Sequence, residues 1–298
     1  MMEYYLNLGK GSGIGSVIFQ IIGSQYILES KNLEAKLIVN ICDASYIAKF
    51  FINNVLDKDK IKNIFFIDKP RSYFKVSNNY IELLSIREED LTTNQISNLN
   101  IYGYYFTKIG AFERYLYYFD KIWFIKKEYK CTEMIKKKYD ICVNLRRGSK
   151  EKLEPHLSIH TVSQYIDIIK QLNLESPKII HTSCTYETFL EFKDLDPSLN
   201  INNSIESTCC RGFWITDFET KSEEEVKLFI IDFLKQLKFM EKSTYFIGSS
   251  STNVGYIASF LRRKIMNNDK YNLYHRDDNN TKIECILFKN KWELGING

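Results

Sequence analysis

The stretch that decides the fold runs from Tyr139 to His160 and reads YDICVNLRRGSKEKLEPHLSIH. It opens with a short apolar run, Ile141 to Leu145, whose length and β-branched residues indicate a buried strand rather than a helix. Three basic residues follow within the next five positions: Arg146, Arg147 and Lys150. Ligands of open α/β sheets bind at the carboxyl ends of the strands, so paired guanidinium groups there predict a ligand that carries phosphate. The alternative is that the two arginines only solvate a loop.

This stretch resembles the first conserved motif of the fucosyltransferase superfamily, which includes α1,6-, α1,2- and protein O-fucosyltransferases. The α1,6 group reads HVRRTDK, followed by a Glu four residues past the Lys and then by His and Tyr. The same residue types occur in the same order here, with a two-residue insertion before the His: Arg146, Arg147, Lys150, Glu154, His160 and Tyr165. The chain departs from the motif at Asn144, which replaces the family's His, and at Gly148-Ser149, which replace its Thr-Asp.

Composition places the chain among globular proteins of moderate charge. Its 298 residues are enough for two domains or one large one, and the 44% hydrophobic and 26% charged content argues against disorder. A net charge of +4 helps to attract an anionic nucleotide sugar, but it is too small and too dispersed to indicate a nucleic-acid partner.

Cysteine usage and the first residues bear on the compartment. Seven Cys, an odd number without metal-ligand spacing, argue against a disulfide framework and for a reducing environment. The first residues, MMEYYLNLGKGSG, contain neither a basic leader with an apolar core nor an apolar run of transmembrane length. Golgi members of the resembled family carry such an anchor, so we expect a cytoplasmic enzyme from a bacterium or virus, or an excised catalytic domain.

A glycine-rich turn, Gly9 to Gly15, separates a predicted strand at Tyr4 to Leu8 from a helix that starts near Ser16. A strand, a glycine turn and a helix present backbone N–H groups to an anion, although such turns also occur without any ligand. A dinucleotide site is a weaker alternative, because the spacing is GxGxG rather than GxGxxG and Asp43 comes later than the usual ribose-binding acid. This weakens the hypothesis of an NAD-dependent oxidoreductase.

The same turn is similar to the N-terminal signature of the fucosyltransferases, which reads GGLGNQLFQ in one branch and GCGYGCQLHH in another. Gly11 to Gln20 of this chain read GSGIGSVIFQ. The resemblance implies that Gly13, Gly15 and Ser16 contact the nucleotide sugar, with Ser16 at a position where some members carry Asn.

The first half of the chain continues as alternating strands and helices, which is typical of a doubly wound domain. The predicted elements are a strand at Leu37 to Ile41, a helix at Ser45 to Leu56 and a strand at Ile64 to Ile67. An aromatic segment, Gly103 to Ile125, favours a core role over a platform for sugar stacking. Clustered lysines between Lys126 and Lys138 indicate the domain boundary.

In the second half, a helix at Thr161 to Leu172 with the capping pair Thr161 and Gln164 precedes a strand at Lys178 to Thr182. The family has an acidic ATDD-like turn after this strand, whereas this chain has hydroxyl groups there. The resemblance makes Thr182 and Ser183 candidates for nucleotide contacts.

Asp194-Leu195-Asp196 has the form of a DxD metal signature, but it follows a helix rather than a strand, so we interpret it as a solvated loop.

The third similarity lies in STYFIGSSSTNVGYIASFLRRK, Ser243 to Lys264. It follows an amphipathic helix, Ser222 to Met240, that has a capping box. A strand that ends at Ile247 leads into a serine turn that caps the next helix, which resembles the family motif FVGTxSSxVxR and is also consistent with a well-capped helix alone. The candidate phosphate-binding residues are Ser249, Ser250, Ser251 and Asn253. Gln236 aligns with the family's guanine-reading Asp, and Asp232 lies one turn earlier.

Together these similarities imply a GT-B-like α/β fold with two Rossmann-like, doubly wound domains that face a cleft. Residues 1–138 would form the acceptor-side domain and residues 139–298 the nucleotide-sugar domain. The implied activity is an inverting, metal-independent transfer of fucose from GDP-fucose to a glycan or protein hydroxyl, without a cofactor. Glu154 is the expected base, Lys150 its relay, and Arg146 and Arg147 the diphosphate ligands, with Asn144 beside them. The alternatives are another nucleotide sugar, a non-catalytic binding descendant and, less favoured, the oxidoreductase.

Overall fold

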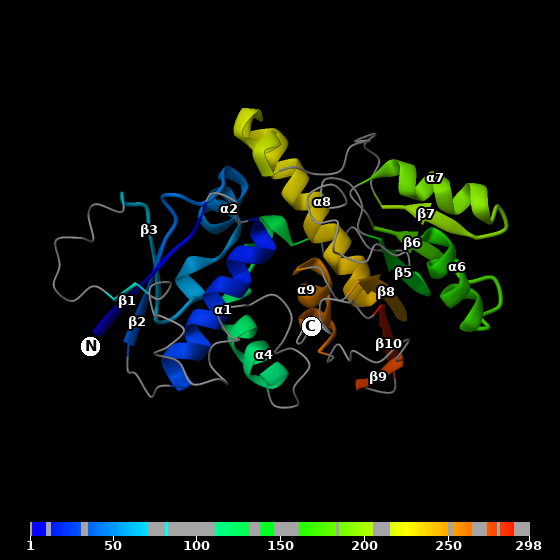
Figure 1. Cartoon of the computed structure of the whole chain (residues 1–298), viewed down its shortest axis with the longest axis horizontal. Coiled ribbons are helices and arrows are strands. Elements are labelled where there is room, and N and C mark those ends of the chain that lie inside the picture. Colours follow the sequence, from blue (N-terminus) through cyan, green and yellow to red (C-terminus); the bar gives the residue numbers. More distant parts are fainter. Residues whose placement is uncertain are drawn as a thin grey trace, which may run out of the picture. The chain divides into compact units, whose positions relative to one another are not determined.

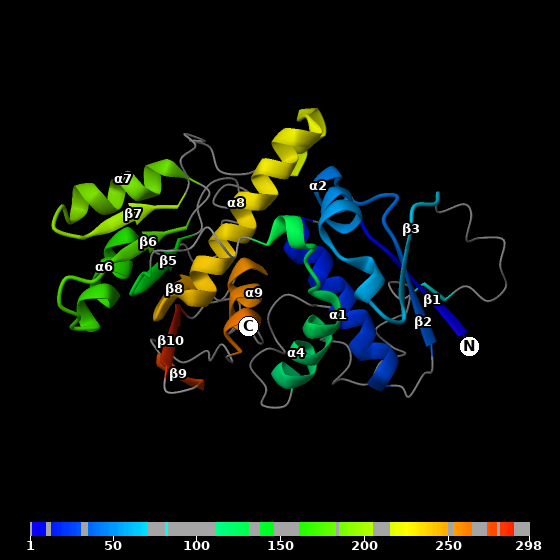
Figure 2. The ribbon, with the colours of Figure 1, turned by 180° about the vertical axis from the view of Figure 1, so that it is seen from behind.

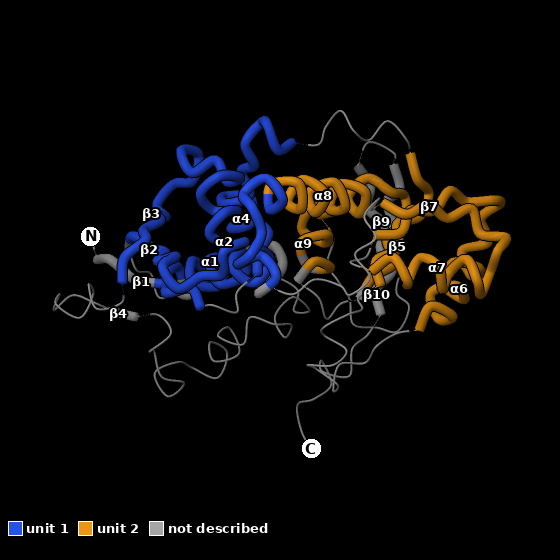
Figure 3. The backbone as a smooth tube through the Cα atoms, turned by 90° about the horizontal axis from the view of Figure 1, so that it is seen from above, with its two compact units in different colours: residues 1–130, 215–226 blue, residues 131–214, 227–298 orange. Residues whose placement is uncertain are grey.

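The computed structural model describes residues 2–9, 13–30, 35–70, 81–82, 111–130, 138–145, 161–182, 185–204, 215–249, 253–263, 273–278 and 281–288. The chain forms two compact units, residues 1–130 with 215–226, and residues 131–214 with 227–298 (Figures 1 and 3). The first unit thus takes in a short segment from late in the chain, which the division into 1–138 and 139–298 did not include. The assignment of acceptor and donor roles to the two domains stays a prediction.

The sheet of the first unit is parallel and has the strand order β3-β2-β1-β4. Its strands are β1 (Met2–Asn7), β2 (Ala35–Asn40), β3 (Ile64–Ile67) and β4 (Ile81–Glu82). β1 and β2 pair along their whole length, from Met2 opposite Ala35 to Asn7 opposite Asn40. The three predicted strands of this half are confirmed, and β3 has the predicted bounds.

Helices α1 (Ile14–Ser30) and α4 (Ala111–Ile122) pack together in the first unit, where Tyr26 stacks on Tyr115 with 5.4 Å between ring centroids. The core interpretation of the aromatic segment is confirmed for Tyr115, Tyr118 and Phe119, each 2% exposed, whereas Tyr117 is half exposed. The remaining helical elements of this unit are α2 (Tyr46–Phe50), the π-helix η1 (Phe51–Val55), and the 3-10 helices η2 (Lys58–Lys60), η6 (Lys127–Tyr129) and η7 (Ile215–Thr220). The predicted helix at Ser45 to Leu56 is therefore α2 and η1 in succession, with Ser45 as its N-cap.

The sheet of the second unit has the order β7-β6-β5-β8-β10-β9 (Figures 1 and 2). Its strands are β5 (Ile141–Asn144), β6 (Ile179–His181), β7 (Ile201–Asn203), β8 (Tyr245–Ser249), β9 (Leu273–Asp278) and β10 (Thr281–Phe288). All neighbouring pairs are parallel except the hairpin of β9 and β10. The chain runs outward from β5 to β7 and then returns to place β8 on the other side of β5, which is the doubly wound arrangement.

Helices α6 (Val162–Gln171) and α7 (Tyr186–Leu195) pack on one face of this sheet. Ile141 and Val143 of β5 join Tyr165 and Phe192 in a buried apolar cluster, because alternate strand residues point to the same face. Thr161 caps α6, and its reciprocal hydrogen bonds with Gln164 confirm the predicted capping box.

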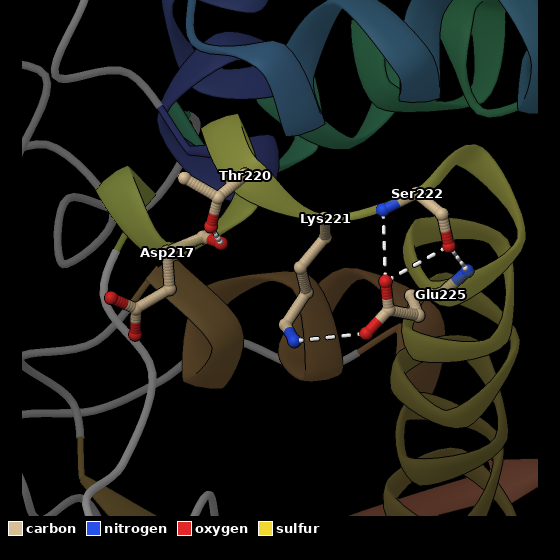
Figure 4. A network of polar contacts seen from close by, with 5 residues as sticks. All are labelled: Asp217, Thr220, Lys221, Ser222 and Glu225. Carbon is tan, nitrogen blue, oxygen red and sulfur yellow. Dashed lines mark hydrogen bonds and ion pairs between the residues drawn. The ribbon is translucent and has the colours of Figure 1, made fainter.

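The long helix α8 (Glu223–Lys242) begins with the second predicted capping box (Figure 4). Glu225 Oε2 accepts from the Ser222 backbone N–H at 2.8 Å, and the Glu225 N–H donates to Ser222 Oγ at 3.3 Å. Lys221 also donates to this carboxylate, at 3.2 Å. The Ser222 hydrogen bonds, with Lys221, lower the pKa of Glu225 to about 2.

No helix in the ranges given above is both long enough and apolar enough to cross a bilayer.

The other end of α8 is held by Arg262 of α9 (Asn253–Arg262), whose side chain is fully buried. Its guanidinium donates to the carbonyl oxygens of Met240, Ser243 and Thr244, the last two at 2.9 Å. The C-terminal end of a helix carries partial negative charge, so a cation at this position is stabilising. Arg262 therefore joins α9 to the turn that leads from α8 into β8.

We expect Arg262→Met to lower the free energy of unfolding by about 3 kcal/mol, because the apolar chain leaves buried carbonyl groups without donors. Chemical denaturation measures this loss. Arg263→Met, at the exposed neighbouring position, is the matched control and should change stability by less than about 0.5 kcal/mol. Equal stabilities for the two variants would show that the buried hydrogen bonds contribute nothing.

Candidate functional site

The strand order of the second unit reverses between β5 and β8, and such switch points are where open α/β sheets bind ligands. Asn144 at the carboxyl end of β5 lies opposite Gly248 near the carboxyl end of β8. The chain leaves these two strand ends toward residues 146–160 and 250–252, which lie outside the described residues. The described part of the candidate site is therefore this strand edge together with the first turns of α6 and α9.

Asn144, Thr182 and Tyr165 form a buried hydrogen-bonded cluster at this edge, and they are 8%, 0% and 0% exposed. The Tyr165 hydroxyl donates to the Asn144 carbonyl oxygen at 3.0 Å. Asn144 Nδ2 donates to the carbonyl oxygen of Thr182 and, at 3.4 Å, to its hydroxyl oxygen. The Thr182 hydroxyl donates in turn to the Val143 carbonyl oxygen at 3.1 Å. The cluster thus ties the ends of β5 and β6 to α6.

This geometry defines what the two candidate residues of the cluster offer a ligand. The amide nitrogen of Asn144 is directed at Thr182, and only its Oδ1 lacks a hydrogen bond within the described residues. The Thr182 hydroxyl is buried and donates to the main chain. Thr182 therefore supports the edge, and Asn144 has an acceptor rather than a donor to offer, which suits a hydroxyl group better than a phosphate.

His181, the last residue of β6, is fully buried beside Phe189 and Phe192 of α7. Its Nδ1 lies 3.1 Å from the Asn203 Oδ1, and no described group hydrogen-bonds its Nε2. Burial lowers the pKa of His181 to about 4, and the Asn203 hydrogen bond acts in the opposite direction. His181 is therefore a neutral core residue at physiological pH and not an accessible base.

Gly248 is required by close packing on the ring of Phe246. A Cβ atom built at Gly248 would lie 2.6 Å from the end of that ring, which is fully buried. Side chains two residues apart on a strand share a face, so the glycine leaves room for the aromatic ring beneath the edge. Beyond it, Ser249 ends β8 and Asn253 begins α9.

At the sheet edge of the first unit, Gly13, Gly15 and Ser16 lie at the start of α1. The Gly13 carbonyl oxygen accepts from the Val17 N–H at 3.0 Å, and Ser16 Oγ accepts from Gln20 Nε2 at 3.0 Å. Ser16 is 8% exposed. Its hydroxyl thus lies within the first turn of the helix.

Sequence reasoning missed Asn7 and Asn40, which end β1 and β2. The Asn40 Nδ2 donates to Asn7 Oδ1 and to the Lys69 carbonyl oxygen, each at 2.9 Å, while its Oδ1 accepts from the Lys69 N–H at 3.2 Å. The side-chain amide of Asn40 thus hydrogen-bonds to the main chain of Lys69 as a backbone peptide group would. This extends the pairing of β2 beyond the end of β3. A sequence pattern that indicates such strand-end residues was present. The segments LNLG, VNIC and VNLR each place an Asn at the end of an apolar run: Asn7, Asn40 and Asn144.

Several predicted site residues fall outside the described residues: Arg146, Arg147, Lys150, Glu154, Ser183, Ser250 and Ser251. The side chains of Ser249 and Asn253 do so as well. Gln236 is half-buried on α8. These assignments stay predictions.

The interpretation of the DxD-like segment as a solvated loop after a helix is wrong for its first two residues, because Asp194 and Leu195 form the end of α7 and only Asp196 follows it. Asp196 Oδ1 accepts from the Ser198 hydroxyl, and Asp196 Oδ2 pairs with Lys170 at 3.0 Å. The Ser198 hydrogen bond, followed by Lys170, lowers the pKa of Asp196. The Asp196 carboxylate thus joins α6 to the loop after α7.

In the part of the chain that the structure describes, no group of three His, Cys, Asp or Glu residues is arranged to hold a metal ion.

We expect acid to destabilise the protein through His181. Its folded-state pKa of about 4 lies below the ordinary value of 6.5, so the unfolded chain binds the proton more readily between these pH values. This contribution to stability is complete above pH 6.5 and is lost as the pH falls toward 4. Between pH 7.5 and 5 the loss should be about 2 kcal/mol. His181→Gln should lack this part of the pH dependence in chemical denaturation, and an unchanged slope would contradict the assignment.

Known structures share this architecture. POFUT1 in complex with GDP-fucose superposes with a TM-score of 0.52 at 9% identity, over 96% of this chain and 97% of that one. The fucosyltransferase NodZ from Bradyrhizobium superposes with a TM-score of 0.50 at 10% identity, over 88% and 93% of the two chains. The apo form of POFUT1 gives 0.50 at 10% identity, over 88% and 95%. No protein-family model and no curated protein sequence matches the chain. The chain thus shares the GT-B-like α/β fold of these structures.

Proposed function

We propose that this protein is an inverting, metal-independent glycosyltransferase that transfers a sugar, with GDP-fucose the expected donor, to a glycan or protein hydroxyl. The observation that carries the proposal is the register of β5 and β8, which sets Asn144 opposite Gly248 at the switch point. The first and third motif-like segments continue directly from these two strand ends. POFUT1, which is similar in fold, was crystallised in complex with GDP-fucose, and this supports the choice of donor.

The proposed donor site neutralises a diphosphate. Arg146 and Arg147 follow β5 directly and would pair with the phosphate oxygens, which guanidinium groups bind in a bidentate manner. The first turn of α9 adds backbone N–H groups, and Ser249, Ser250, Ser251 and Asn253 would add side-chain donors. These groups would stabilise the charge that grows on the departing nucleotide.

The acceptor hydroxyl must lose its proton as it attacks the anomeric carbon, and Glu154 is the proposed base. Lys150 would orient or relay that proton. Asn144 Oδ1, the free acceptor of the cluster at the strand edge, is suited to a hydroxyl of the donor. Gly13, Gly15 and Ser16 stay proposed contacts of the nucleotide sugar.

We propose Asp232, beside the aligned Gln236, as a second candidate for the residue that reads the base. α8 leads into β8 and so runs from the carboxyl edge of the sheet toward its amino edge. β8 has five residues, which extend over about 16 Å, and a helix covers this length in about eleven residues. Counting back about eleven residues from Lys242, the last residue of α8, reaches the neighbourhood of Asp232. A carboxylate at that level can accept two hydrogen bonds from guanine, as an amide cannot.

The test separates the roles of Arg147 and Glu154. Arg147→Ala should lower turnover about 100- to 1,000-fold and weaken GDP binding about tenfold or more, because the diphosphate charge is present before and after the reaction. Glu154→Gln should lower turnover about 100-fold or more while GDP affinity stays within about twofold, because a base acts on the acceptor. Donor turnover and calorimetric GDP affinity are the two measurements.

Arg263→Ala is the matched control, since it removes the same charge from an exposed position immediately after α9, at the end of the helix that is farther from the switch point. Assays in EDTA and in added Mg²⁺ or Mn²⁺ should give equal turnover. A Glu154→Gln variant with normal turnover would remove Glu154 as the base. Loss of all turnover in EDTA, with recovery in a divalent ion, would contradict the metal-independent mechanism.

A further inference from the structure

Tyr165 is a buried tyrosine whose hydroxyl reaches the last residue of a neighbouring strand. It lies in the first turn of α6 and is fully buried, with its ring edge-on to that of Phe192 at 6.3 Å. Packing in the buried apolar cluster involves only the aromatic ring of Tyr165 and does not require its hydroxyl. The hydroxyl instead donates to the Asn144 carbonyl oxygen, 3.0 Å away, at the point where the chain leaves β5.

The same residue, Asn144, is held from a second direction. Its Nδ2 donates to the Thr182 carbonyl oxygen, and Thr182 is itself fixed by two hydrogen bonds to the Val143 carbonyl oxygen, at 2.8 Å from its N–H and 3.1 Å from its hydroxyl. The opposite amide orientation would set two oxygens against each other, so the Thr182 carbonyl also determines which amide atom faces it. The end of β5 is thus anchored at its carbonyl by α6 and at its side chain by the end of β6.

This double anchor comes immediately before the residues that are proposed to bind the diphosphate. Leu145 is 2% exposed and packs in the same cluster as Tyr165, and Arg146 is the next residue in the chain. Charged groups stabilise a transition state best when their direction is set in advance, and a displacement of about 1 Å costs about 100-fold in rate. An anchor at Asn144 limits the directions in which the chain can continue from β5.

We propose that Tyr165 is a positioning residue, which holds the Asn144 carbonyl and so sets the direction in which the chain leaves β5 toward the diphosphate ligands Arg146 and Arg147. This inference rests on the proposed function. Tyr165 does not contact the donor in this account, and it acts together with Thr182 through Asn144. The two anchors therefore belong to one unit and their effects on donor binding are coupled.

Tyr165→Phe tests the inference because it removes the hydroxyl and keeps the ring. The variant should bind GDP about five- to tenfold more weakly than the wild type, with a matching rise in the KM for the donor, and its thermal midpoint should fall by about 2 to 4 °C. Tyr118→Phe is the matched control. Tyr118 is equally buried, on α4 of the first unit, and no described group hydrogen-bonds its hydroxyl. It should leave GDP affinity unchanged.

Asn144→Ala supplies the second anchor variant, because it removes the amide that donates to the Thr182 carbonyl oxygen and keeps the main-chain carbonyl that Tyr165 holds. If both anchors hold the same strand end, the double variant should lose less GDP affinity than the product of the two single losses, because removal of one anchor already frees the strand end. Independent, multiplicative losses would overturn the proposal. So would a Tyr165→Phe variant that loses thermal stability but binds GDP as the wild type does, which would make the hydroxyl purely structural. A wild-type protein that binds no nucleoside diphosphate would instead overturn the proposed function itself.

Discussion

The parallel pairing of β5 with β8 is the constraint on which the architecture of the second unit depends. It places Asn144 opposite Gly248 and reverses the strand order, so that the two connections that follow these strands begin side by side. The pairing requires Gly248 to lack a side chain, because the buried ring of Phe246 occupies that space. It also requires the turn between α8 and β8, which Arg262 holds through three carbonyl oxygens. The packing around Phe246 and Arg262 therefore helps to set β8 beside β5, and with it the pair of strand ends at the carboxyl edge of the sheet.

Each unit ends its first strand with an asparagine whose amide group is hydrogen-bonded at the neighbouring strand end. Asn7 meets Asn40 in the first unit, and Asn144 meets Thr182 in the second. A buried polar group is costly unless it is paired, so these residues hold the strand ends in one arrangement where an apolar residue would not. The pairs differ in how their amide oxygens are used. The Asn40 amide uses both its nitrogen and its oxygen on protein groups, whereas Asn144 Oδ1 has no hydrogen bond within the described residues.

Local sequence predicted the elements whose signals are local. The apolar run IFFI predicted the bounds of β3. Thr161 with Gln164 predicted the start of α6, because a capping box acts within the first turn of a helix. β9 was not predicted, since LYHRDD is polar, and edge strands are commonly charged. The return of 215–226 to the first unit and the complete burial of His181 were not predicted either, because both depend on packing between distant segments. At the candidate site, Asn144 and Thr182 were predicted as ligand contacts, while their mutual hydrogen bonds and the role of Tyr165 became visible only in three dimensions.

The central claim is that the carboxyl edge of β5 and β8 binds a nucleoside diphosphate. Amide hydrogen exchange with and without GDP, read by mass spectrometry, tests it most directly because it locates the ligand without any assumption about the acceptor. The account predicts that GDP slows exchange in peptides that span the end of β5 to the start of α6, and the end of β8 to the start of α9, and that NAD has no such effect. Protection by NAD confined to the turn between β1 and α1, with no response to GDP in the second unit, would contradict it.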